Sequence, residues 1–263
     1  MALDRNEFRL HYQAKRDIAS GRITGVEALL RWQHVDLGLV APMRFIPIAE
    51  ETGLIIPIGK WVLRKACEQC VAWRSRGLPV LSIAVNLTAR QFRDEQLLPD
   101  LKAILADTRM DPRLLEIELH EGVLIHDTEQ TLRILTQLKA LGVRIAVDDF
   151  GVGYSSLAAL QRFPLDTIKL DRSITRGFVQ DVENRELADA IIAMGKSLSL
   201  TVVAQGVETR EQAESLRAHA CDELQGFYFK RPLPVEQFTE LLQEQLADVS
   251  QIRGPPEWRE LAG

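Results

Sequence analysis

Carboxylate and amide side chains recur directly after short apolar runs of this sequence. They are Glu27, Asn86, Glu118, Asp148 and Asp149. If the fold brings them together, carboxylates repel one another and need compensating positive charge. A hard divalent cation such as Mg²⁺ or Mn²⁺ takes carboxylate, amide and water oxygens as ligands. The pattern therefore predicts a divalent-metal site.

The adjacent pair Asp148-Asp149 indicates which chemistry such a site would perform. A carboxylate can bridge two ions, and two metals about 3.5–4 Å apart suit phosphodiester hydrolysis. Lys169, at the end of the apolar run TIKL, could neutralise a phosphate or orient the attacking water. Gln205 follows the apolar run VVA at a comparable position, but an amide is neither an acid nor a base at neutral pH.

Each of these residues also has a purely structural interpretation. Short polar side chains at the start of a helix accept hydrogen bonds from its free N–H groups. The alternatives are a cap at Asp148-Asp149 for a helix near Ser155, a cap at Asn86 or Thr88, and an ion pair between Lys169 and Asp171.

The elements that would position these residues alternate along the chain. From about residue 80, short apolar runs are followed by amphipathic helical patterns, and six such repeats predict a parallel sheet covered by helices. Before them, FRLHYQAKRD and ITGVEALLRW are joined by the turn-like IASGR, which predicts an antiparallel hairpin. The fold class is α/β, a closed (β/α) barrel, and in barrels the chemistry lies at the carboxyl ends of the strands.

Composition limits the class of protein. The 263 residues carry a net charge of −5, which argues against a DNA or RNA duplex as partner. No apolar run approaches the roughly 20 residues of a membrane span, and three cysteines fit a reducing cytoplasm. Cys67 and Cys70 form a CxxC within a helical pattern and are interpreted as small apolar residues. We expect one domain over residues 1–247, with a tail or linker over 248–263.

Nine ordered segments resemble one family. GVEALLRW at residues 25–32 resembles the signature of the EAL-domain cyclic di-GMP phosphodiesterases. The other segments are FRLHYQ, FIPIAEETGLI, VNLT, EIELHE, DDFGVGYSSL, IKLDRS, VVAQGVET and LQGFYFKRPLP. The resemblance implies a modified (β/α)8 TIM-like barrel with one antiparallel strand. It also implies hydrolysis of cyclic di-GMP to linear pGpG with two Mg²⁺ or Mn²⁺ ions.

The resemblance also implies a role for individual residues. Asp148 would bridge the two ions and Asp149 would hold the second. Lys169 is similar to the lysine that contacts the attacking water, and Glu121 to the acid that holds the loop after residue 150. The remaining metal ligands would be Glu27, Asn86 and Glu118, and the substrate contacts would be Gln13, Arg31, Asp171, Glu208 and Gln225. The family further suggests a homodimer through DFGVGYSS and fusion to sensory or GGDEF domains.

The sequence departs from the family pattern at a few positions. QAK replaces a QPI-like segment, and His120 and Val152 stand where threonine is common. The largest departure is AQGVE in place of AEGVE, because the missing glutamate is the family's general base. We therefore expect either an enzyme whose turnover is lowered by Gln205 or a receptor that binds cyclic di-GMP without hydrolysing it. Since the other site residues are kept, the pattern is typical of one recent or engineered Glu-to-Gln change.

Overall fold

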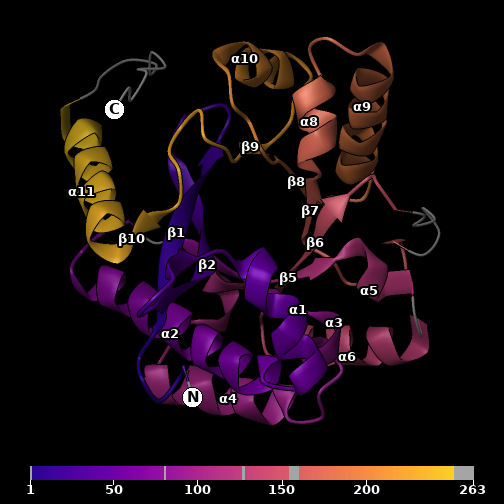
Figure 1. Cartoon of the computed structure of the whole chain (residues 1–263). Coiled ribbons are helices and arrows are strands. Elements are labelled where there is room, and N and C mark those ends of the chain that lie inside the picture. Colours follow the sequence, from indigo (N-terminus) through magenta and orange to yellow (C-terminus); the bar gives the residue numbers. More distant parts are fainter. Residues whose placement is uncertain (1, 80, 126–127, 154–159, 252–263) are drawn as a thin grey trace.

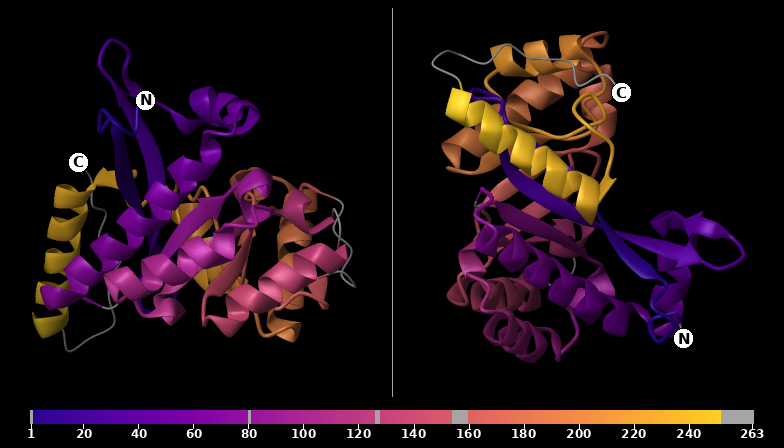
Figure 2. Two further views of the ribbon diagram at one scale, coloured as in Figure 1. Left: turned by 90° about the horizontal axis from the view of Figure 1, so that it is seen from below. Right: turned by 90° about the vertical axis from the view of Figure 1, so that its left-hand side faces the viewer.

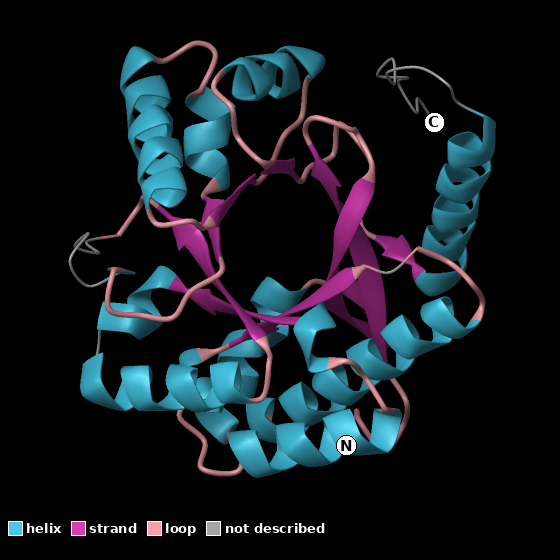
Figure 3. Ribbon diagram, turned by 180° about the vertical axis from the view of Figure 1, so that it is seen from behind, coloured by secondary structure: helices cyan, strands magenta, loops and turns pink. Residues whose placement is uncertain are grey.

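A computed structural model describes residues 2–79, 81–125, 128–153 and 160–251 of the chain. Its strands form a closed ring surrounded by helices (Figure 3). Eight strands of the described chain make up the ring in the order β1, β2, β4, β5, β6, β7, β8, β9, and β9 pairs with β1 again. Their bounds are β1 Phe8–Asp17, β2 Ile23–His34, β4 Ser82–Leu87, β5 Leu115–His120, β6 Arg144–Phe150, β7 Thr167–Leu170, β8 Thr201–Ala204 and β9 Glu223–Leu224.

Strand β1 is the one ring strand of the described chain that runs against its neighbours. It pairs antiparallel with β2 and with β9, while the pairs from β2 round to β9 are parallel. The β1–β2 hairpin turns near Gly21, whose φ of 69° lies in the left-handed region that glycine tolerates. The expected modified (β/α)8 barrel with one antiparallel strand is confirmed.

Helices cover the outside of the ring, and two short strands extend it (Figure 1). Strand β3 (Gly38–Val40) pairs with the end of β2 in a hairpin that projects from the molecule (Figure 2), and β10 (Leu233–Pro234) pairs with β1. The helices are α1 Pro42–Thr52, α2 Ile55–Ser75, α3 Ala89–Phe92, α4 Leu97–Thr108, η1 Pro112–Leu114, α5 Glu121–Ile125, α6 Thr128–Ala140, α8 Arg172–Gly177, α9 Val182–Ser197, α10 Arg210–Ala218 and α11 Val235–Gln251.

The hydrophobic core lies mainly between the strands and the helices. Trp73 on α2 is buried and packs edge-on against Tyr12 of β1, with ring centroids 4.9 Å apart, and also against Phe238 of α11. Its indole N–H donates to Thr239 Oγ1 at 2.9 Å, so the polar end of this large side chain is satisfied. These contacts fix the helices against β1 and leave the inside of the ring to polar side chains.

The expected division into a domain over residues 1–247 and a tail over 248–263 stays a prediction. Helix α11 continues to Gln251, whereas we expected the tail to begin at residue 248. Residues 252–263 lie outside the described residues, as does the predicted helix start near Ser155. In the part of the chain that the structure describes, no helix is long and apolar enough to cross a membrane.

Candidate active site

Lys169 lies at the centre of a polar cluster inside the ring. Its side chain is fully buried, and its ammonium lies 3.0 Å from Glu27 Oε2 and 2.6 Å from Glu118 Oε2. Asp148 Oδ1 lies 3.3 Å away on the strand next to β7. Four strands, β2, β5, β6 and β7, therefore deliver one cation and three carboxylates to one place. The structure thus brings these four predicted site residues together.

Glu27 accepts the most hydrogen bonds of the three carboxylates in the cluster. Asn86 Nδ2 donates to its Oε1 at 2.6 Å, and Gln225 Nε2 donates to its Oε2 at 2.7 Å. Burial alone would raise the pKa of Glu27, but the Lys169 ammonium and the hydrogen bonds from Gln225 and Asn86 outweigh it and lower the pKa to about 2. Glu27 is thus held as a carboxylate.

Glu118 is in the opposite electrostatic situation. It is fully buried, and burial together with the negative charges of Glu27 and Asp148 raises its pKa well above the usual value despite Lys169. Its Oε1 atom is buried and receives no hydrogen bond from any described residue. One ammonium therefore does not compensate the charge of three carboxylates. The uncompensated repulsion acts most strongly on Glu118.

The chain turns at Asp148 and Asp149 through an irregular stretch of β6. The pairing register with β7 shifts between Val147 and Phe150, and Asp149 has a φ of 52°, which non-glycine residues rarely adopt. Burial, followed by the charges of Asp148 and Asp171, raises the pKa of Asp149 to about 6. The bulge thus places two consecutive carboxylates in one electrostatic environment, which a regular strand would not do.

Two strand-end residues flank this turn. His120 Nε2 lies 3.8 Å from Asp149 Oδ2, and His120 Nδ1 accepts a hydrogen bond from the Gly122 backbone. On the other side, the Gln205 amide nitrogen donates to Asp148 Oδ1 at 2.8 Å. Gln205 therefore touches the cluster directly and is not an ordinary loop residue.

Glu121 connects the end of β5 to the chain that follows β6. It is buried, and its Oε2 accepts hydrogen bonds from the backbone N–H groups of Gly151 and Gly153, each at 3.2 Å. A Cβ atom at residue 153 would lie 2.8 Å from the Glu121 carboxyl, so the contact depends on glycine there. The predicted anchoring contact is present, although residues 154–156 of the DFGVGYSS segment lie outside the described residues.

Of the five predicted substrate contacts, two belong to the cluster. Gln225 bonds to Glu27 and also donates to Gln13 Oε1 at 3.3 Å, so these two amides belong to the cluster. Arg31 lies four residues beyond Glu27 on β2 and is half-buried. Asp171 caps helix α8 by accepting from the Ser173 backbone N–H at 2.7 Å, and Glu208 faces Arg176 at 3.4 Å. Glu208 is thus paired outside the cluster.

The structural alternatives meet different outcomes. Thr88 caps α3 together with Gln91 in a reciprocal capping box, whereas Asn86 turns to Glu27 instead. Lys169 pairs with carboxylates of the ring rather than with Asp171. Cys67 and Cys70 are buried, free and on α2, as expected of small apolar residues.

The side-chain donors of the cluster fit a divalent cation, although the described residues are not arranged as a preformed metal site. Among them, no three His, Cys, Asp or Glu side chains are already grouped as an ion would require. The Lys169 ammonium accounts for this, because it lies between the carboxylates. The unpartnered Glu118 oxygen and the raised pKa of that residue show that negative charge is left over. Oxygen ligands with excess negative charge suit Mg²⁺ or Mn²⁺.

A second polar layer lies beneath the cluster, and the sequence reasoning missed it. Lys15 on β1 pairs with Glu116 on β5, and Thr167 Oγ1 donates to Glu116 Oε2 at 2.9 Å. Both charged residues are buried. The available signal was spacing: Lys15 and Glu116 each stand two residues before or after a site residue, on the same face of the strand.

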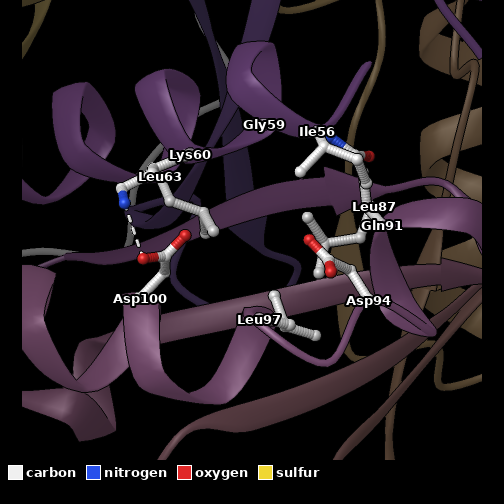
Figure 4. A pocket seen from close by; sticks show the side chains of 9 residues that line it. All are labelled: Ile56, Gly59, Lys60, Leu63, Leu87, Gln91, Asp94, Leu97 and Asp100. Atoms are coloured by element: carbon white, nitrogen blue, oxygen red, sulfur yellow. Dashed lines mark hydrogen bonds and ion pairs between the residues drawn. The ribbon is translucent and has the colours of Figure 1, made fainter. Parts of the chain in front are cut away.

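The small pocket of Figure 4 is separate from this site. It encloses about 20 Å³ between α2, α3 and α4, and Lys60 and Asp100 pair across it at 2.6 Å. It holds no residue of the cluster. The candidate site is therefore defined by side-chain convergence and not by this pocket.

Comparison with known proteins identifies the family. The sequence-family model of the EAL domain matches residues 1–232. The chain belongs to the EAL domain family. It is 44% identical over 236 residues to the bifunctional diguanylate cyclase/cyclic di-GMP phosphodiesterase MucR of Pseudomonas aeruginosa. The aligned region covers 90% of this chain and 34% of that relative. Against the cyclic di-GMP phosphodiesterase PdeR of Escherichia coli the identity is 39%, over 90% of this chain and 36% of the relative.

Solved structures agree with the EAL fold. The PaMucR phosphodiesterase in complex with c-di-GMP superposes with a TM-score of 0.88 at 44% identity, over 90% of this chain and 96% of that one. The EAL domain protein from Listeria monocytogenes gives a TM-score of 0.82 at 31% identity, over 92% and 95%. This EAL domain spans about a third of the length of the curated relatives it matches.

Proposed function

We propose that this EAL domain binds cyclic di-GMP and hydrolyses it to linear pGpG, with turnover lowered by Gln205. Relatives named cyclic di-GMP phosphodiesterases support the substrate class. The carboxylates and the ammonium of the polar cluster support a site that could hold metal ions and offset phosphate charge. A homodimer through DFGVGYSS, a cytoplasmic location and fusion to sensory or GGDEF domains are further proposals that follow from the family resemblance.

The proposed cofactors are two Mg²⁺ or Mn²⁺ ions. When bound, they would activate the attacking water and neutralise charge on the phosphate and leaving oxygens. We assign the first ion to the carboxylates and amide nearest Lys169, and the second to the turn at the end of β6. The ligands are Glu27, Asn86, Glu118 and Asp148 for the first, with Asp148 and Asp149 for the second.

The chain's own residues would bind and orient the substrate. Lys169, with an ammonium that cannot be lost at neutral pH among three carboxylates, would orient the water and offset phosphate charge. Gln13 and Gln225 would contact the dinucleotide, with Arg31, Asp171 and Glu208 around them. Glu121 would keep the end of β6 in place through Gly151 and Gly153.

The observation that carries this proposal is the convergence of Glu27, Glu118 and Asp148 on the buried Lys169. The Gln205–Asp148 hydrogen bond of 2.8 Å is the reason for expecting lowered turnover. The amide N–H donates a hydrogen bond to a carboxylate of the cluster and so partly replaces a cation. An ionised glutamate could not donate there and would repel Asp148 unless positive charge lay between them. Gln205 therefore favours the metal-free cluster and cannot accept a proton during hydrolysis.

The test compares Gln205→Glu with this chain in cyclic di-GMP hydrolysis with Mn²⁺. Restoring a general base is expected to raise kcat by about 10²–10⁴-fold. The pGpG product is measured by chromatography, and ligand binding by titration. Gln137→Glu, an exposed change on α6 with the same charge difference, is the control and should leave kcat unchanged.

The second candidate function is a cyclic di-GMP receptor without turnover. The same Gln205–Asp148 bond favours it, because the amide stabilises the site without a base. If Gln205→Glu stays inert while both forms bind cyclic di-GMP tightly, the receptor is correct and the enzyme proposal fails. A chain that neither binds nor cleaves cyclic di-GMP would contradict both candidates.

A further inference from the structure

The buried pair Lys15–Glu116 lies directly below the proposed metal ligands. Both side chains are inside the ring, and β5 carries Glu116 and Glu118 on the same face, two residues apart. Lys15 reaches Glu116 from β1, which lies three strands away around the ring. Its ammonium is also 3.9 Å from Glu118 Oε1, the buried oxygen that receives no hydrogen bond from the described residues.

Strand β2 leaves room for the Lys15 side chain. Gly25 is the antiparallel partner of Lys15, and a Cβ atom there would lie 2.8 Å from Lys15 Cε and 2.6 Å from Ser82 Oγ. A contact below 3.0 Å would force something to move, so the glycine and the lysine depend on each other. The side chain thus has a defined path across the inside of the ring.

Stability alone does not explain this pair. Replacing a buried ion pair by neutral side chains of similar size is often neutral or even stabilising, because desolvation offsets the attraction. Glu116 contacts Lys15, Thr167 and Arg144, whereas Glu118 Oε1 has, among the described residues, only the more distant attraction of Lys15. The two oxygens of Glu118 are therefore drawn in opposite directions, Oε2 to Lys169 and Oε1 to Lys15.

We infer that Lys15 is a positioning residue, which fixes the orientation of the Glu118 carboxylate from below so that it can bind a divalent cation. The inference rests on the proposed function, because that function makes Glu118 a metal ligand. Residues behind metal ligands commonly change metal affinity or activity by about 10–100-fold when they are replaced. Lys15 touches neither substrate nor metal in this scheme and acts through Glu118.

The experiment uses the Gln205→Glu protein as the parent. Lys15→Met should lower Tm, because the buried charge of Glu116 then loses its nearest cation and keeps only Arg144, at 3.4 Å, among the described residues. The double variant Lys15→Met/Glu116→Gln removes both charges and should recover most of that Tm. Compared with the parent, the double variant should nevertheless bind Mn²⁺ about 10-fold more weakly, as measured by calorimetry without nucleotide. Its kcat should be about 10-fold lower than that of the parent, and its KM should lie within about twofold of the parent's value. The control Lys60→Met/Asp100→Asn removes an ion pair outside the site and should change none of these quantities.

The outcomes separate the inference from the proposed function. If the parent binds Mn²⁺ and the double variant binds it equally well, Lys15 does not position Glu118 and the inference alone is wrong. A double variant that remains as unstable as Lys15→Met would make the role structural and would also contradict the inference. If the parent itself binds no Mn²⁺, the proposed metal site is wrong and the inference falls with it.

Discussion

At the scale of single residues, one ammonium lies among three carboxylates. Lys169 contacts Glu27, Glu118 and Asp148, so the cluster keeps a net negative charge. The carboxylate with the most hydrogen bonds, Glu27, has a lowered pKa, and the buried Glu118 has a raised one. The ammonium thus stabilises the site in the absence of another cation.

Lys169→Met tests this balance. The change leaves the carboxylates without a buried partner, and removing one partner of such a network lowers the free energy of unfolding by about 3–5 kcal/mol. Added Mn²⁺ should recover part of this loss, because it would supply the missing positive charge. Urea denaturation with and without Mn²⁺ measures both effects.

A matched lysine gives the comparison for that experiment. Lys60→Met removes a largely exposed ammonium from its pair with Asp100 and should change the free energy of unfolding by no more than about 1 kcal/mol, with no Mn²⁺ dependence. If Lys169→Met were as stable as the parent without Mn²⁺, the carboxylates would not depend on Lys169 and the proposed charge balance would be wrong.

The sequence predicted the upper layer of the site but not the lower one. Glu27, Glu118 and Asp148 stand at strand ends, and in a barrel the strand ends meet at one face. Lys15 and Glu116 lie deeper, within the strands and not at their carboxyl ends. Only the register of β1 against β2, which sets Lys15 opposite Gly25, shows that a long charged side chain fits inside the ring.

At the scale of elements, segments with a clear apolar pattern were predicted well, and several short elements without one were missed. The β1–β2 hairpin and the alternation after residue 80 carry enough apolar residues to show a period. Strands β3 and β10 and helix α8 are too short for any period to appear. They form because neighbouring elements complete them, as β2 pairs with β3 and Asp171 caps α8.

The turn after β8 depends on glycine and sets the position of Gln205. Gly206 has a φ of 68°, and a Cβ atom there would lie 2.7 Å from Arg172 Cβ. Gly206→Ala should therefore combine left-handed strain with a steric clash. Gly38 has a similar φ of 65° but no heavy atom within 4 Å of the added carbon, so Gly38→Ala isolates the strain.

Urea denaturation of the two variants separates these effects. Gly38→Ala should lower the free energy of unfolding by about 1–2 kcal/mol through left-handed strain alone. Gly206→Ala should lower it by about 1–3 kcal/mol more, since overpacking adds to the strain. Equal losses in the two variants would show that the turn accommodates the extra carbon and does not hold Gln205 rigidly.

At the scale of the whole molecule, the barrel and its helices bury all three cysteines. Cys67 and Cys70 face inward from α2, and Cys221 lies just before β9 with its Sγ 3.3 Å from the Val202 carbonyl oxygen. Burial raises the pKa of Cys67 and Cys221 to about 12 and that of Cys70 to about 11. Since the thiolate is the reactive form, the folded protein should present no reactive thiol at neutral pH.

Thiol labelling therefore reports the opening of the whole fold. At pH 8 a chromogenic disulfide reagent should label none of the three thiols in the folded protein within minutes, and all three in urea. Unfolded thiols ionise near 9.0 and folded ones only near 11–12, so the folded state binds more protons between these values and its stability should fall as pH rises through them. Urea denaturation at pH 8 and pH 10 measures that fall. Rapid labelling of even one thiol without urea would show that α2 or the segment just before β9 opens separately from the rest of the barrel.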